Sequence, residues 1–131
     1  KFGGEHNYIL FNRHTEVSIS GVRLTAVKAA HSDPDAIGVI LDWDGKLYYH
    51  TGDTLYSKDI FADIPEGIDT LFLPINGVGN NMNVIDAARF AKRIGARRSV
   101  PLHWGLFDSL DPVAFQAAGR IIPTIYQEIG E

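Results

Sequence analysis

The first half of the chain alternates apolar and polar residues with the period of a β-strand. This alternation predicts two antiparallel pairs, with strands over residues 17–19, 22–30, 36–43 and 46–50. Ser20-Gly21 and Asp44-Gly45 separate the members of each pair, and both are typical of tight turns. A further short strand is expected at 8–11, and the polar, glycine-bearing residues 1–7 are expected to be flexible.

Strands alternate with helices in the second half of the chain. The nearly continuous apolar run 69–75 predicts a central strand that is covered on both faces. The clearest helix spans residues 84–94, with Asn83 as its N-cap and Gly95 as its stop. The remaining elements expected here are a short helical patch at 56–64, a strand at 96–102, a helix at 111–119 that starts with Asp111-Pro112, and a strand at 121–129. The order of elements predicts a layered α/β fold.

Three potential metal ligands each stand where a predicted strand gives way to a loop. They are His31, Asp53 and His103. Loops at strand ends converge on one edge of an α/β sheet, where functional sites gather. Imidazole and carboxylate are ligands for zinc, manganese or iron. Taken alone, Gly52-Asp53-Thr54 is also an ordinary turn, so the combination of the three residues carries the metal hypothesis.

Other polar residues have simpler interpretations. His50 lies within its strand and is expected to be a buried or hydrogen-bonded histidine rather than a ligand. Asp33 and Asp35 could orient a metal-bound histidine, but the proline between them favours a turn. His6 and His14 are expected in loops or at the surface. The glycine- and asparagine-rich loop 76–81 could bind substrate through its N–H groups, but it lacks the lysine of a phosphate-binding P-loop.

The three ligands lie in motifs that resemble a known family. The segments Ala29-Ala30-His31-Ser32, His50-Thr51-Gly52-Asp53-Thr54 and Pro101-Leu102-His103-Trp104-Gly105 are similar to the last three metal motifs of the metallo-β-lactamase superfamily. The closest similarity is to ascorbate-6-phosphate lactonase-like metal-dependent hydrolases, and it extends over nearly the whole chain after about Glu16. The superfamily's first motif, His-x-His-x-Asp-His, is absent, because no two of the five histidines have that spacing.

The resemblance therefore implies one domain, residues 1–131, that forms the C-terminal half of an αβ/βα sandwich. The chain starts at Lys1 rather than at methionine, and we expect it to be a fragment. The missing N-terminal half or another copy of the chain is the expected partner, in a homo-oligomer. The alternative is a non-catalytic fragment or interaction domain that retains this half of the fold.

The resemblance also implies a catalytic site. Two divalent ions, zinc or manganese, are expected in the complete protein, one bound in part by His31 and the other by His103. Asp53 would bridge both ions and is the expected catalytic residue, and a bridging hydroxide would attack an ester or lactone of a small molecule. Thr54, Asp33 and Trp104 are implied only as residues that orient ligands or line the pocket.

Composition narrows these alternatives. The content of 45% hydrophobic and 21% charged residues is that of an ordinary globular domain. The absence of cysteine removes disulfides and thiolate ligands, and it fits a cytoplasmic protein. A net charge of −4 argues against general binding to nucleic acid, and so against a nucleic-acid-processing member of the superfamily. No apolar run reaches membrane-spanning length, so we expect no membrane partner.

Overall fold

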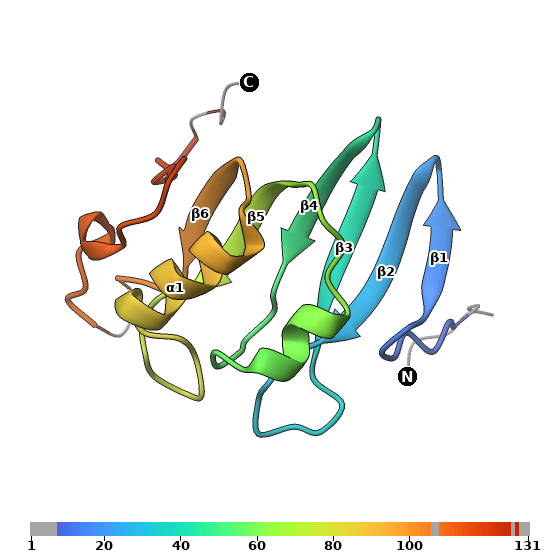
Figure 1. The fold of residues 1–131 in the computed structure, drawn as a ribbon, viewed down its shortest axis with the longest axis horizontal. Helices are drawn as coiled ribbons and strands as arrows, with labels where there is room; N and C mark the ends of the chain where they lie inside the picture. Colours follow the sequence, from blue (N-terminus) through green and yellow to red (C-terminus); the bar gives the residue numbers. More distant parts are fainter. Residues whose placement is uncertain (1–7, 106–107, 127, 129–131) are drawn as a thin grey trace, which may run out of the picture.

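The fold is a single six-stranded mixed sheet with helices on one face (Figure 1). The computed structural model describes residues 8–105, 108–126 and Glu128. The strands lie in chain order across the sheet: β1 (Glu16–Ile19), β2 (Val22–Lys28), β3 (Ile37–Trp43), β4 (Lys46–His50), β5 (Ile68–Pro74) and β6 (Arg98–Leu102). Strands β1 to β4 are antiparallel, whereas β4, β5 and β6 are parallel. The predicted α/β class is confirmed.

The α-helix α1 (Val84–Ile94) has the predicted bounds because both of its caps are local in sequence. The Asn83 side chain accepts hydrogen bonds from the N–H groups of Ile85 and Asp86, and Gly95 ends the helix at φ 68°. The described residues also form two short 3₁₀ helices, η1 (Lys58–Ala62) and η2 (Pro112–Ala114). No helix in the described part of the chain has the length and apolar character needed to cross a bilayer.

The core lies between the sheet and the helices α1 and η1, which cover the same face (Figure 1). Phe90 of α1 is fully buried, and its ring lies 6.3 Å from that of Tyr49 on β4 and 5.1 Å from that of Phe61 on η1. Each such aromatic pair contributes about 1 kcal/mol beyond the area that it buries. These contacts hold both helices against the middle of the sheet.

The opposite face of the sheet carries an apolar groove of about 370 Å³. Its lining residues come from four strands: Val22, Leu41, Trp43, Tyr48, His50 and Phe72. Trp43 is 57% exposed, which is unusual for a large side chain on a sheet face. Apolar residues on both faces are typical of strands covered on both sides. We refer to this surface as the open face.

Two predictions for the end of the chain are wrong. Residues 111–119 form only the single turn η2 rather than a helix, because Phe115 is extended and fully buried while Arg120 donates to the carbonyls of Val113 and Phe115. None of the described residues of the predicted strand 121–129 forms a strand. One parallel bridge joins Arg120, just before this segment, to Ser99, and Pro123 lacks the N–H that a ladder needs. Residues 127 and 129 lie outside the described residues.

The prediction of a strand at 8–11 is also wrong. The sheet ends at β1, and residues 8–11 lie outside it, with Tyr8 and Leu10 at 85% and 79% exposure. A short apolar run forms a strand only where a neighbouring edge offers it backbone partners. The prediction for residues 1–7 lies outside the described part of the chain. The helical patch predicted at 56–64 is confirmed in part, as η1.

Candidate metal centre

Four strands end at the same edge of the sheet. Strands β2 and β4 run in the same direction because each is antiparallel to β3, and β5 and β6 are parallel to β4. The loops that follow them lie along this edge, at the bottom of Figure 1, and we call it the loop edge: residues 29–36, 51–57, 75–83 and 103–105. The opposite edge holds the two-residue turns Ser20-Gly21 and Asp44-Gly45, and we call it the hairpin edge. His31, Asp53 and His103 all belong to the loop edge.

Two of these three residues are in contact. Asp53 Oδ1 lies 3.0 Å from His103 Nε2, and the side chains are 44% and 50% exposed. His103 has a φ of 53°, a left-handed conformation that is uncommon for residues other than glycine. Such conformations gather at functional sites, where the surrounding structure holds them in place. A carboxylate and an imidazole on separate strands are therefore brought together at an accessible point.

His31 lies on the neighbouring loop with its ring turned toward residues 75–83. Its Nε2 is 2.9 Å from the Gly79 carbonyl, and its Nδ1 is 3.2 Å from the Ser32 hydroxyl. A carbonyl only accepts, so Nε2 carries the hydrogen in this contact. Across the described ranges, no group of three or more His, Asp or Glu side chains is arranged to hold a metal ion. The structure brings Asp53 and His103 together and leaves the His31 ring apart.

Close packing of β4 on β3 fixes the turn that carries Asp53. Gly52 has a φ of 64°, and a Cβ there would lie 2.4 Å from the Ile37 carbonyl oxygen. A Cβ on Gly38 would in turn lie 2.8 Å from the Thr51 carbonyl oxygen. Both positions therefore require glycine, one for its conformation and both for lack of space.

Thr54 joins the loops of the edge to one another. Its buried hydroxyl accepts a hydrogen bond from the N–H of Ala30 at 2.8 Å, next to His31. Its own N–H donates to the Asn81 side chain at 3.1 Å, and its carbonyl accepts from the N–H of Met82 at 2.9 Å. Sequence reasoning missed Asn81, since nothing in a run of glycine and asparagine separates it from the exposed Asn80.

His50 is hydrogen-bonded, as predicted, but it is exposed rather than buried. Its ring stacks on that of Phe72 on the open face, with centroids 6.3 Å apart, and its Nδ1 accepts from the N–H of Gly52 at 3.1 Å. Partial burial of the ring lowers the pKa of His50. The electrostatic effect of neighbouring His103 lowers the pKa of His50 further, while Asp53 acts in the opposite direction.

The aspartates of loop 29–36 hold a turn, as the proline indicated. Asp33 Oδ1 accepts from the N–H of Asp35 at 2.9 Å, and the Asp33 carbonyl accepts from Ala36. His14 is a surface residue, with a side chain that is 68% exposed and 3.2 Å from Asp63. His6 lies outside the described residues.

A pocket of about 500 Å³ opens beside His103. Asn76, Trp104, Asp108 and Pro123 are among its lining residues. The Trp104 indole donates to the Pro101 carbonyl, and Asp108 accepts from the N–H groups of Gly105 and Leu110, so both side chains are fixed. The pocket offers space for a small molecule next to the contact between Asp53 and His103.

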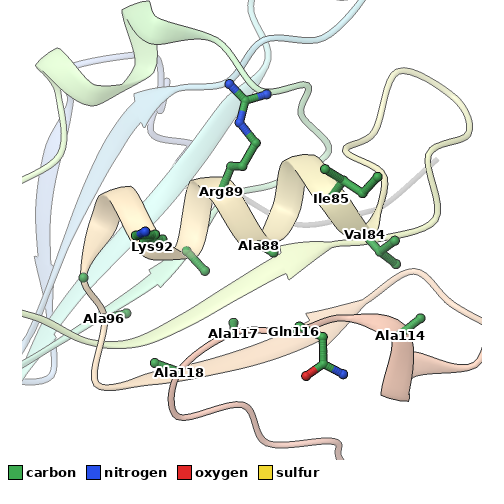
Figure 2. A pocket seen from close by; sticks show the side chains of 12 residues that line it. Val84, Ile85, Ala88, Arg89, Lys92, Ala96, Ala114, Gln116, Ala117 and Ala118 are labelled. Carbon is green, nitrogen blue, oxygen red and sulfur yellow. The ribbon is translucent and has the colours of Figure 1, made fainter.

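A separate groove of about 730 Å³ lies between α1 and residues 114–118 (Figure 2). Its floor is formed largely by alanine side chains, including Ala88, Ala96 and Ala117. Arg89 extends away from this floor in Figure 2, and its guanidinium lies 4.7 Å from the centre of the Tyr56 ring. No histidine or acidic residue lines this groove in the described part of the chain, so it lacks the donors of a metal centre.

Comparisons with known proteins agree with the motifs. A family model described as a beta-lactamase superfamily domain matches residues 4–104. Proteins named metal-dependent hydrolases from Pyrococcus abyssi and Nitratidesulfovibrio vulgaris are 36% and 37% identical over 109 residues. These matches cover 75% and 80% of this chain but only 48% and 45% of the relatives. The chain thus spans about half the length of the curated relatives that it matches.

Solved structures share the fold. Igni18, described as a metallo hydrolase from Ignicoccus hospitalis, has a TM-score of 0.72 at 25% identity, over 86% of this chain and 55% of that protein. The metallo-β-lactamase fold protein YhfI of Bacillus subtilis has a TM-score of 0.67 at 20% identity, over 88% of this chain and 52% of that one. The six-stranded mixed sheet with α1 is therefore part of a known fold, in which each of these solved chains continues well beyond the matched region.

Proposed function

Since this chain belongs to the beta-lactamase superfamily, we propose that the full-length protein is a metal-dependent hydrolase to which the chain contributes His31, Asp53 and His103 as ligands. The observation that carries this proposal is the 3.0 Å contact between Asp53 and His103 at the loop edge. Because the chain spans about half the length of these relatives, we propose that further ligands come from a part of the full-length protein outside this chain. By itself the chain is expected to bind divalent metal weakly, because three ligands cannot close two sites.

The donors suit the ions proposed for this family. Imidazole nitrogen and carboxylate oxygen are ligands of both Zn²⁺ and Mn²⁺. Asp53 and His103 are already close enough to face one cation, while His31 would first have to release Gly79 or bind through its other nitrogen. The set fits in donor type, and two of its three members fit in position. We propose zinc or manganese, with two ions in the complete protein.

The roles of the residues follow from their chemistry. Divalent cations, when bound, acidify a coordinated water and stabilise the oxyanion that develops on the substrate. Asp53 is the only carboxylate among the three ligands, and a carboxylate has two oxygens that can each bind a different ion, so we assign it the bridging and catalytic role. The pocket beside His103 orients the substrate between Asn76, Trp104 and Asp108. A lactone or another ester of a small molecule is the proposed substrate.

The open face supports the proposed partners. Its apolar groove, with Trp43 57% exposed, is suited to contact with the rest of the full-length protein or with a second copy of the chain. We propose that the functional protein buries this face and is a homo-oligomer. The lack of cysteine and the charge of −4 support a cytoplasmic protein that does not bind nucleic acid.

The test is an assay of the full-length protein after removal of metal and reloading with Zn²⁺ or Mn²⁺. A panel of lactones and simple carboxylic esters should be hydrolysed by the reloaded protein and not by the metal-free protein. Phosphorylated and unphosphorylated members of the panel separate substrate classes. Metal-independent hydrolysis, or no hydrolysis of any member by protein that holds bound metal, would contradict the proposal.

A further inference from the structure

Thr54 occupies a special place in the loop edge, because its hydrogen bonds reach the peptides next to two proposed ligands. Its N–H belongs to the peptide that directly follows Asp53, and this group donates to Asn81 Oδ1 at 3.1 Å. Its hydroxyl accepts at 2.8 Å from the N–H of Ala30, the residue before His31. The same hydroxyl donates to the Leu55 carbonyl at 3.0 Å, so its orientation is fixed.

Burial makes the loss of any of these hydrogen bonds costly. Thr54 is fully buried and Asn81 is 6% exposed, so water does not replace a bond that is lost. Leu55 adds a return bond from its N–H to the Ala30 carbonyl at 2.8 Å. The backbones around His31 and Asp53 are thus tied together from both sides of Thr54.

Asn81 extends the connection to the third loop. Met82 donates its N–H to the Thr54 carbonyl at 2.9 Å, next to the bond from Thr54 to the Asn81 side chain. Two residues before Asn81 on the same loop, the Gly79 carbonyl accepts from His31 Nε2 at 2.9 Å. One loop therefore contacts both the residue beside Asp53 and the His31 ring itself.

We propose that Thr54 is a positioning residue that sets the separation of the His31 and Asp53 loops, and that Asn81 holds Thr54 in place. This inference rests on the proposed function, because it concerns how metal ligands are oriented. Residues that orient ligands commonly affect metal affinity by about 10- to 100-fold when they are replaced. The hydroxyl, rather than the size of the side chain, is the part that matters.

The experiment compares Thr54→Val with Thr54→Ser in the full-length protein. Valine keeps the shape of threonine but neither accepts from Ala30 nor donates to Leu55, whereas serine does both. Thr70→Val is the matched control, because Thr70 is also buried but its hydroxyl bonds to Asp69 within β5. The measurements are Zn²⁺ affinity by competition with a chelator, the visible spectrum of the Co²⁺ form, thermal stability, and hydrogen exchange of the Ala30 amide.

We expect Thr54→Val to weaken Zn²⁺ binding by about 10- to 100-fold and to alter the Co²⁺ spectrum. Thr54→Ser should restore both, and Thr70→Val should leave the affinity within about twofold even if it lowers stability. The Ala30 amide should exchange faster in Thr54→Val alone, a result that does not depend on metal.

Asn81→Ala and Asn81→Asp provide a second pair in case Thr54→Val does not fold. Aspartate keeps an oxygen for the Thr54 N–H, so it should retain more metal affinity than alanine. Asn80→Gly is the control, since Asn80 is exposed and has a φ of 62° that glycine adopts freely.

Unchanged metal affinity in both Thr54→Val and Asn81→Ala, with a wild-type protein that binds Zn²⁺, would overturn the positioning role and leave the proposed function intact. A wild-type protein that binds no divalent metal would overturn both. A loss of affinity that is equal in Thr54→Val, Thr54→Ser and Thr70→Val would mean that general destabilisation is responsible, and it would also overturn the role of the hydroxyl.

Discussion

The loop edge and the hairpin edge both contain aspartate and glycine at turns, yet the two edges differ in packing. At the hairpin edge, Asp44 and Gly45 have φ values of 49° and 72°, and a Cβ on Gly45 would meet no atom within 4 Å. At the loop edge, a Cβ on Gly52 would lie 2.4 Å from Ile37. The Gly-Asp sequence of a motif and the Asp-Gly sequence of a hairpin therefore meet different demands. Only the loop edge holds its aspartate in a fixed, interconnected structure.

The largest contrast is expected in turnover. Asp53→Asn and Asp44→Asn make the same chemical change at opposite edges, and asparagine tolerates the conformation of Asp44. If Asp53 joins two cations, Asp53→Asn should lower turnover by on the order of a hundredfold or more, because small displacements of reacting groups are that costly. Asp44→Asn should leave turnover unchanged. Equal activity of the two variants, normalised to bound metal, would remove Asp53 from the catalytic role.

Alanine substitutions at Gly45 and Gly52 should differ in how much they destabilise the protein. Gly45→Ala adds only the cost of a left-handed conformation, about 1–2 kcal/mol. Gly52→Ala adds the same cost and a clash with the backbone of β3, for a total of about 2–5 kcal/mol. Urea unfolding of both variants measures the difference, and a larger loss in Gly45→Ala would contradict the packing described for the loop edge.

The two histidine ligands should act on metal occupancy rather than on chemistry. His31→Ala and His103→Ala should each weaken binding of one ion, and excess metal should partly restore turnover. His50→Ala is the comparison, because His50 lies near them but faces the open side of the sheet. It should lower stability more than turnover per metal-loaded molecule. Metal content and turnover measured together separate the three variants, and a fully metal-loaded but inactive His50→Ala would show that the assignment of ligands is wrong.

The ion pairs near the two edges should also differ in how much they stabilise the fold, but by a smaller amount than the glycines. Asp63, with a side chain only 5% exposed, bonds to Arg13 and to the N–H of Lys28 at the end of β2, whereas Asp42 near the hairpin edge is 31% exposed and pairs with Arg23. Asp63→Asn should lower the free energy of unfolding by about 1.5 kcal/mol. Asp42→Asn should lower the free energy of unfolding by only about 0.5 kcal/mol.

The pH dependence of stability tests the contribution of Asp63 and Arg13. The hydrogen bond from Arg13, followed by those from Lys28 and His14, holds the pKa of Asp63 well below its usual range. A carboxyl with a lowered pKa contributes stability above its unfolded pKa, near pH 4, and loses that contribution as the pH falls toward the folded value. Urea midpoints measured from pH 7 to pH 3 should therefore fall more in wild type than in Asp63→Asn. Parallel curves would contradict the role assigned to Asp63.

Sequence reasoning succeeded where the signals are local. The helix at 84–94 has both caps within its own sequence, and the Asp44-Gly45 turn fixes its hairpin from two residues. It failed at 111–119 and 121–129. A cap and an apolar pattern were present there, but Phe115 is buried in the core, and the pairing with β6 near this segment is a single bridge from Arg120 to Ser99. Tertiary contacts decided these segments.

The same limit applies to the site. The placement of His31, Asp53 and His103 at strand ends follows from the pattern of strands, so their common edge was predictable. The rotation of the His31 ring toward Gly79 and the bond from Thr54 to Asn81 depend on loops that are 48 and 27 residues apart in sequence. No short-range signal encodes such contacts, and Asn81 became visible only in the folded chain.

The most direct test of the proposed metal centre is a crystal structure of the full-length protein loaded with Zn²⁺, with anomalous scattering measured at the zinc edge. We predict an anomalous peak shared by Asp53 and His103, and a second one that Asp53 shares with His31 after its ring has left Gly79. Zinc bound elsewhere, with Asp53 and His103 still in contact only with each other, would contradict the assignment of the loop edge as the metal centre.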